Sequence, residues 1–136
     1  MKFSVEYLIR FQHCDPAGIV FYPRYYEMFN QVVEDWFAQA LGWSFASLEA
    51  RDEGIPLVHA EADFLASSQI GDYVTFELVL RRIGRKSFTV EITGTRGEEV
   101  RLRATLVLAY ANISNGLRAI SIPPELRERM LPYLEN

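Results

Sequence analysis

The chain has 136 residues, close to the usual size of one domain, and its 49% hydrophobic content is too high for a disordered protein. The formal net charge of −4 provides no general basic surface for nucleic acid, and the single cysteine, Cys14, excludes an intrachain disulfide. The longest apolar run, Leu106 to Ala111, is too short to span a membrane, and the N-terminus has no signal-peptide core. We therefore expect a single domain over residues 1–136, located in the cytoplasm, with no nucleic-acid or membrane partner.

The first third of the chain predicts a strand, a loop and a long helix. Apolar and polar side chains alternate from Phe3 to Phe11, which indicates a half-buried strand. The residues from Cys14 to Val20 contain turn-forming Asp, Pro and Gly and predict a loop. Pro23 suits the first position of a helix, and apolar residues then recur at helical spacing as far as Gly42, a typical stop. A helix of about nineteen residues with such a wide apolar face should be heavily buried.

The remainder of the chain predicts mostly sheet. Alternating segments predict strands at 57–66, 74–80, 88–92 and 100–108, and short helices are expected at 44–53 and 123–131. A sheet with one apolar face covers that face most simply by wrapping around the single long helix, so the expected fold class is α+β. The exposed edges of such a sheet favour pairing with a second copy, which makes a homodimer the smallest assembly we expect.

One segment, from Phe11 to Pro23, combines residues that could carry chemistry. It places the carboxylate of Asp15 on a tight loop just before the long helix. Free N–H groups at a helix N-terminus can bind an anion or a developing oxyanion. Asp15 beside these donors would pair a nucleophile or base with a group that polarises a carbonyl. On composition alone a structural role is favoured, in which Asp15 caps the helix or forms an Asx turn with Pro16.

The run Cys14-Asp15-Pro16-Ala17-Gly18-Ile19-Val20-Phe21-Tyr22-Pro23, followed by a tyrosine-rich helix, resembles the 4-hydroxybenzoyl-CoA thioesterase family of hot-dog proteins. The resemblance extends over nearly the whole chain through Gly54-Ile55-Pro56 and Arg85-Lys86-Ser87-Phe88, which follow in the same order. It implies a hot-dog fold that hydrolyses an acyl-CoA thioester to a free acid and coenzyme A. No separate cofactor is implied, because coenzyme A is part of the substrate. In this family the sites form between paired subunits. Tetramers are also common in it, so the resemblance favours a homotetramer.

The resemblance also implies roles for particular residues. Asp15 matches the catalytic aspartate, acting as nucleophile or general base, and Tyr22 matches the residue whose backbone N–H polarises the thioester carbonyl. Arg85 and Lys86 match the stretch that holds coenzyme A phosphates. Pro23 stands where many members have His, which points to the hydroxybenzoyl-type branch and an aromatic acyl group, with a short-chain acyl group as the alternative.

Several further residues are candidates for the site. Gly18 belongs to the motif, and Tyr25 and His59 are candidates to line the acyl pocket. His59, Glu61 and Asp63 share a strand face but show no metal-ligand signature, so no metal is expected. His13 and Cys14 are poorly placed for a nucleophile pair, because neighbouring extended residues point apart; Cys14 is expected to be a small buried residue.

Arg101 and Arg103 lie on the polar face of the last long strand and are interpreted as surface charges or dimer contacts. Two other functions remain open. One is a hot-dog protein that binds acyl-CoA as a sensor or carrier without catalysis. The other is a hydratase on the same fold, which is disfavoured because no His follows Asp15 until His59.

Overall fold

The computed structural model describes residues 1–136. Its elements, in chain order, are β1 (Phe3–Leu8), η1 (Phe11–His13), α1 (Tyr22–Asp35), η2 (Trp36–Leu41), α2 (Phe45–Ala50), β2 (Glu53–Gly54), β3 (Leu57–Phe64), β4 (Tyr73–Ile83), β5 (Ser87–Arg96), β6 (Glu99–Ala109), β7 (Ala111–Asn112), β8 (Arg118–Ala119), α3 (Pro124–Met130) and η3 (Leu131–Tyr133). Here η1 and η3 are 3-10 helices, and η2 is a π-helical turn.

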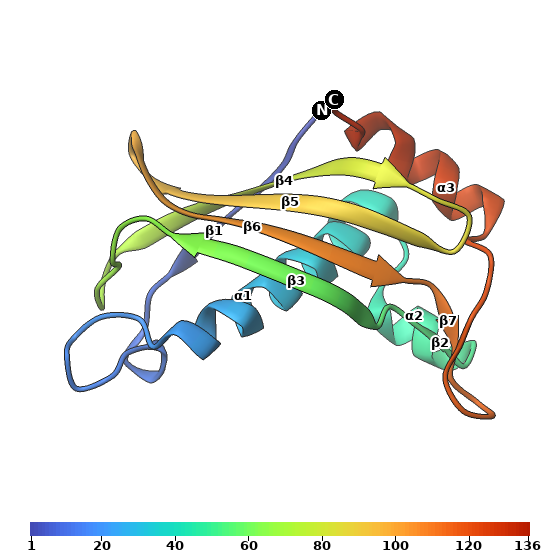
Figure 1. Ribbon diagram of the computed structural model, residues 1–136, viewed down its shortest axis with the longest axis horizontal. Helices are drawn as coiled ribbons and strands as arrows, with labels where there is room; N and C mark the ends of the chain where they lie inside the picture. Colours follow the sequence, from blue (N-terminus) through green and yellow to red (C-terminus); the bar gives the residue numbers. More distant parts are fainter.

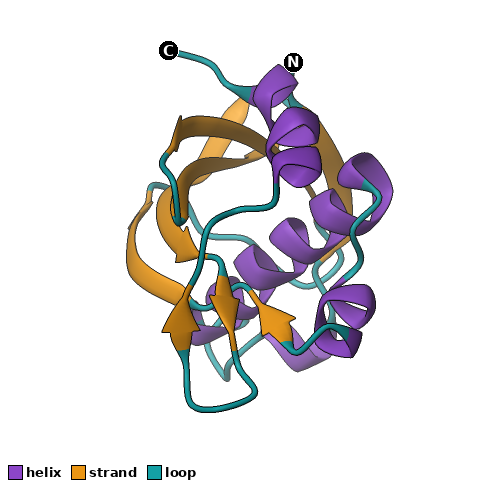
Figure 2. Cartoon of the chain, turned by 90° about the vertical axis from the view of Figure 1, so that its right-hand side faces the viewer, coloured by secondary structure: helices purple, strands orange, loops and turns teal.

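Five strands form one antiparallel sheet in the order β1-β4-β5-β6-β3, and this sheet curves around the long helix α1 (Figure 1). The strands β2, β7 and β8 form a small second sheet near α2, at the far end of the molecule from the start of α1 (Figures 1 and 2). The predicted α+β arrangement, a sheet wrapped around one helix, is confirmed. Strands β1 and β3 are the two edges of the main sheet.

The long helix ends where its sequence signals indicate and begins one residue earlier than they predict. It starts at Tyr22, so Pro23 occupies the second helical position instead of the first. Its regular α-helical part passes directly into η2, and the combined helix ends at Gly42, whose φ of +73° is the left-handed conformation that glycine adopts most readily. Arg129 of α3 donates a hydrogen bond of 2.7 Å to the carbonyl of Leu41 and so satisfies one of the last carbonyl groups of the helix.

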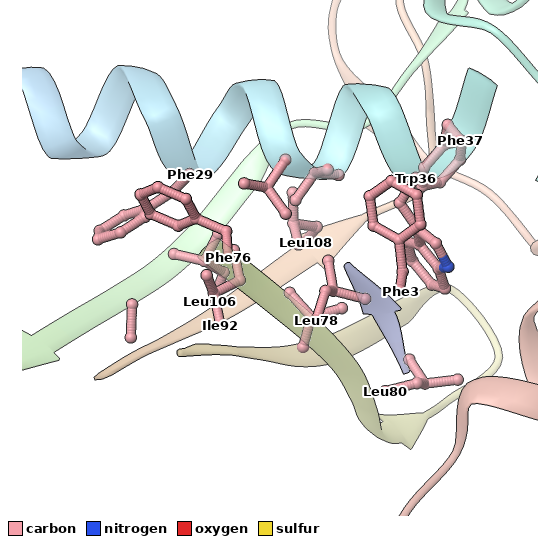
Figure 3. Close-up of a cluster of buried hydrophobic side chains, with 14 of the residues drawn as sticks. Phe3, Phe29, Trp36, Phe37, Phe76, Leu78, Leu80, Ile92, Leu106 and Leu108 are labelled. Carbon is pink, nitrogen blue, oxygen red and sulfur yellow. The ribbon is translucent and has the colours of Figure 1, made fainter. Parts of the chain in front are cut away.

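The core lies between this helix and the concave face of the sheet. Figure 3 shows Phe29 and Trp36 of the helix on the side that faces Phe76 and Leu78 of β4, and all four side chains are buried. Burial of one such side chain contributes about 1.5–3 kcal/mol. The helix is therefore fixed on the sheet mainly by packing, and its N-terminus is held in one position at the edge of the core.

The first strand is shorter than its sequence pattern indicates. It ends at Leu8, and Phe11 lies in η1 with 84% of its side chain exposed. The backbone N–H of Arg10 donates to Nδ1 of His13 at 2.8 Å, which turns the chain away from the sheet. A local turn therefore overrides the alternation that continues as far as Phe11.

Candidate active site

A cavity of about 520 Å³ opens at the N-terminus of α1. One side is formed by the loop before the helix and by the first turn of the helix, and the other by the end of β3 and the residues that follow it. The lining residues are Asp15, Ile19, Val20, Phe21, Tyr22, Tyr25, Phe64, Leu65, Ala66, Ser67 and Ser68. The wall is mostly apolar and contains one carboxylate, a composition typical of a site for an organic ligand with one reactive or polar group.

Asp15 is held by a compact turn of its own loop. Its N–H donates to the carbonyl of Ile19 at 3.0 Å, and its carbonyl accepts from the N–H of Gly18 at 2.9 Å. Oδ1 accepts the N–H of Ala17 at 2.9 Å, whereas Oδ2 accepts no hydrogen bond within the chain. The predicted Asx turn is confirmed, and the half-buried carboxylate keeps one free oxygen at the cavity.

The first turn of α1 leaves a backbone donor free beside this carboxylate. The N-cap residue is Phe21, which has no side-chain cap, so the alternative that Asp15 caps the helix is wrong. Tyr22 is the first helical residue, and its N–H has no acceptor within the helix and none in the adjoining loop. Asp15 and Tyr22 both line the same cavity.

Aromatic rings line the deep side of the cavity. Tyr25 stacks on Phe64 with ring centroids 5.2 Å apart and an interplanar angle of 21°. Tyr25 is only 4% exposed, and its hydroxyl, which lies near Ser68, forms no hydrogen bond. Burial raises the pKa of the Tyr25 hydroxyl, so this group stays a neutral phenol at physiological pH.

The other predicted site residues lie elsewhere in the protomer. Gly18 is exposed on the Asp15 loop, with a φ of +82°, and does not line the cavity. His59 is exposed on β3. Arg85 and Lys86 lie in the turn between β4 and β5, at the opposite end of the sheet from the Asp15 loop (Figure 1), where Nε of Arg85 donates to Oγ of Ser121 at 3.1 Å. A single chain therefore brings together Asp15, Tyr22 and Tyr25 only.

His13 and Cys14 form no hydrogen bond with each other. Nδ1 of His13 accepts the N–H of Arg10, and burial is the main cause that lowers the pKa of His13. Cys14 is half-buried, and its Sγ lies 3.6 Å from the carbonyl of Arg10. No group of three or more His, Cys, Asp or Glu side chains is placed to hold a metal ion, and no helix combines the length and apolarity needed to cross a membrane.

One polar residue near the cavity differs from its sequence-based prediction. The sequence predicts that Arg101 is a surface charge or a dimer contact, but its side chain is only 11% exposed and is hydrogen-bonded beside the cavity wall. Arg103, two positions further along β6, is exposed as expected. The surface-charge interpretation of Arg101 is therefore wrong, and alternation along a single strand gives no sign of the irregularity that turns this residue.

Comparisons with known proteins identify relatives of this chain. Residues 9–130 match the family model described as "Thioesterase-like superfamily". The chain is 30% identical over 133 residues to 4-hydroxybenzoyl-CoA thioesterase of Pseudomonas sp. strain CBS-3, with 92% of this chain and 94% of that protein covered. It is 29% identical over 122 residues to a 1,4-dihydroxy-2-naphthoyl-CoA hydrolase of Acaryochloris marina, with 87% and 88% covered.

Solved structures of thioesterases have a similar fold. The structure of the Pseudomonas 4-hydroxybenzoyl-CoA thioesterase matches with a TM-score of 0.85 at 28% identity, covering 94% of this chain and 98% of that one. A gentisyl-coenzyme A thioesterase also matches with a TM-score of 0.85, at 27% identity over 91% of this chain and 98% of that one.

Proposed function

This chain belongs to the thioesterase-like superfamily and has its hot-dog fold, and from that membership we propose that it hydrolyses an acyl-CoA thioester to a carboxylic acid and free coenzyme A. The relatives described above are named as hydrolases of CoA thioesters. The single observation that carries the proposal is that the Asp15 carboxylate and the free N–H of Tyr22 line one mainly apolar cavity. A coenzyme A thioester as substrate also fits the cytoplasmic location expected from the sequence.

The proposed chemistry uses two groups of the chain. The thioester carbonyl oxygen accepts a hydrogen bond from the Tyr22 N–H, and the N-terminal end of the helix dipole stabilises the negative charge that develops on that oxygen. The free oxygen of Asp15 then attacks the carbonyl carbon, the carbon–sulfur bond breaks, and coenzyme A leaves as thiolate, after which water cleaves the mixed anhydride. In the alternative route Asp15 removes a proton from water, which attacks the same carbon directly. Both routes consume one water and release the same two products.

Rapid-quench single turnovers with enzyme in excess separate the two routes. The peptide that contains Asp15 is mapped by mass spectrometry at each quench time. An acyl group on Asp15 that appears before the free acid supports direct attack. Free acid that accumulates without any acylated peptide supports the water route.

For the acyl group we propose an aromatic acid, because Tyr25 and Phe64 present stacked rings to the cavity and Phe21 and Tyr22 add two further rings to its wall. The test is a panel of benzoyl-, 4-hydroxybenzoyl-, 1,4-dihydroxy-2-naphthoyl-, butyryl- and hexanoyl-CoA, with thiol release followed by a free-thiol reagent. We expect the highest kcat/KM among the aromatic thioesters. Tight binding of these compounds without thiol release from any of them would replace the hydrolase with an acyl-CoA-binding protein.

We also propose that the complete site forms in a homodimer joined along β3. This edge strand and its extension expose the apolar side chains of Leu57, Val58, Phe64 and Leu65. A two-fold axis perpendicular to the sheet pairs equivalent edge strands antiparallel. Such pairing sets the Leu57 end of one β3 beside the Phe64 end of the other.

This arrangement accounts for the distance between the predicted site residues. The Arg85–Lys86 turn lies at the Leu57 end of the sheet, since Ser87 pairs with Ala109 and Leu57 pairs with Leu108. An antiparallel β3 pair would bring the partner's turn toward the cavity of the first protomer, where the two cations can bind coenzyme A phosphates. Two such dimers would make the homotetramer that the resemblance favours.

Light scattering tests the assembly. We expect at least twice the 15.7 kDa of one chain, and Val58→Asp should lower the mass because it places a charge on the β3 edge. Ser4→Asp on the opposite edge strand is the matched control and should leave the mass unchanged. A Val58→Asp variant with the wild-type mass would refute the β3 interface.

A further inference from the structure

Strand β6 contains a bulge at Arg101. Gly94 of β5 pairs with Leu102, but the next residue, Thr95, pairs with Val100, so Arg101 is an extra residue with no partner on β5. A bulge re-aims the side chain of the extra residue. Here the Arg101 guanidinium meets the segment that follows β3, and this segment is one wall of the cavity.

Arg101 contacts four consecutive residues of that wall. Its backbone carbonyl accepts the N–H groups of Leu65 at 2.8 Å and Ala66 at 3.2 Å. Its Nη1 lies 2.8 Å from the carbonyl oxygen of Ser67 and 2.9 Å from Oγ of Ser68. Arg101 does not itself line the cavity, but its backbone carbonyl binds one half of the wall segment Leu65–Ser68 and its guanidinium binds the other half.

The same contacts extend to the loop that carries the carboxylate. The carbonyl of Ser68 accepts the N–H of Val20 at 3.0 Å, and Ile19 forms a β-bridge with Gln69. The carbonyl of Ile19 in turn accepts the N–H of Asp15. A continuous series of hydrogen bonds therefore connects Arg101 through the wall to the Asp15 loop.

Acidic partners fix the guanidinium in this place. Asp72 Oδ2 lies 3.1 Å from Nη1 of Arg101, and Nε donates to Glu99. Asp72 is held in turn by the N–H of Gln69 at 3.0 Å. A guanidinium offers donors in a rigid planar arrangement, whereas a lysine ammonium is a single point charge that cannot serve both Glu99 and the wall.

We propose that Arg101 is a positioning residue of the active site: it holds the wall Leu65–Ser68 and, through Ser68, keeps the Asp15 loop in register with the first turn of α1. This inference rests on the proposed function and extends it to a residue outside the cavity. A displacement of about 1 Å in a catalytic group can reduce the rate about 100-fold. Removal of the guanidinium should therefore lower kcat by an amount of that order.

The test compares Arg101→Gln and Arg101→Lys with the matched control Arg103→Gln, which changes an exposed arginine of the same strand. For each variant kcat and KM are measured on the best thioester of the panel, together with Tm and hydrogen–deuterium exchange of peptides spanning 15–22 and 64–69. For Arg101→Gln we expect a loss in kcat on the order of 100-fold and faster exchange in these two peptides alone. Arg101→Lys keeps the charge but loses one of the guanidinium contacts, so its Tm and kcat should both lie between those of Arg101→Gln and the wild type. Arg103→Gln should match the wild type throughout.

Three outcomes would overturn the inference: a wild-type kcat in Arg101→Gln, an equal loss in Arg103→Gln, or exchange that rises uniformly over the whole chain. If Arg101→Gln does not fold, a wild-type kcat in Arg101→Lys would also overturn the inference. A wild-type protein that releases no thiol from any thioester refutes the proposed function by itself. The exchange experiment needs no activity and still decides whether Arg101 organises the cavity.

Discussion

The substitution Asp15→Asn tests the active-site hypothesis most directly, because the amide can keep the loop while it removes the charge. The side-chain carbonyl of Asn can accept the Ala17 N–H that Oδ1 of Asp15 now accepts at 2.9 Å. The backbone hydrogen bonds of this turn, to Ile19 and from Gly18, do not involve the side chain. The free energy of unfolding should therefore change by no more than about 0.5 kcal/mol.

The effect on catalysis should be much larger. A neutral amide neither attacks a thioester nor accepts a proton from water, and loss of a general base alone lowers the rate about 10²- to 10⁴-fold. This range corresponds to about 3–5 kcal/mol of transition-state stabilisation. KM should change little, because the carboxylate acts mainly on the transition state.

Thiol release at saturating thioester gives kcat, and urea unfolding gives stability on the same preparations. Asp15→Ala provides the control for the loop: it should match Asp15→Asn in kcat but lose about 1 kcal/mol more in stability, since the Ala17 N–H loses its acceptor. A kcat of Asp15→Asn within about tenfold of the wild type would refute the assignment of Asp15 as the catalytic carboxylate.

Three further predictions concern stability and are measured by urea unfolding. Gly42→Ala should destabilise by more than the roughly 1–2 kcal/mol of left-handed strain. A Cβ there would lie 2.5 Å from Nη1 of Arg129, and moving that group would break its hydrogen bond to the Leu41 carbonyl. Gly97→Ala, also at positive φ but in open space, should show the strain alone, and equal losses in both variants would contradict this reasoning. Tyr25→Phe should leave the free energy of unfolding unchanged or raise it, because the removed hydroxyl is buried without a hydrogen-bond partner. A decrease of more than about 1 kcal/mol would mean that the hydroxyl does have such a partner. The hydrogen bond from the Gln69 N–H, together with Arg101 and Arg96, lowers the pKa of Asp72. The ionised Asp72 should therefore contribute its full stabilisation of the folded state above the unfolded pKa of about 3.9. This contribution should disappear as the pH falls through the lower pKa of the folded state. Asp72→Asn should remove this part of the pH dependence, and an unchanged acid transition in that variant would argue against it.

The sequence predicted those parts of the fold that follow from regular periodicity. The long helix, its stop at Gly42 and the four long strands each carry enough residues for the alternation or helical spacing to be read. Strands β2, β7 and β8 have two residues each, too few for any pattern. The end of β1 was missed because the hydrogen bond between Arg10 and His13 turns the chain while the alternation continues.

The candidate site was predictable only in part. The Asp-Pro-Ala-Gly composition indicated the Asx turn at Asp15, whereas only the family resemblance pointed to the Tyr22 N–H, which the observed start of the helix leaves free. Residues 65–68 form a wall with no periodic pattern, and Arg101 reaches it through a bulge, which depends on pairing with β5 and is not encoded in the alternation of β6 alone. It stays a prediction that His59, Arg85 and Lys86 belong to the same site as Asp15, because these residues lie away from Asp15 in a single protomer.

The two sides of the cavity come from different stretches of chain, which meet through the Val20–Ser68 hydrogen bond and the bridge from Ile19 to Gln69. Under the proposed function, a substitution in the wall that alters which acid is accepted would therefore also shift the segment that carries Asp15, so the choice of acid and the rate of hydrolysis should change together.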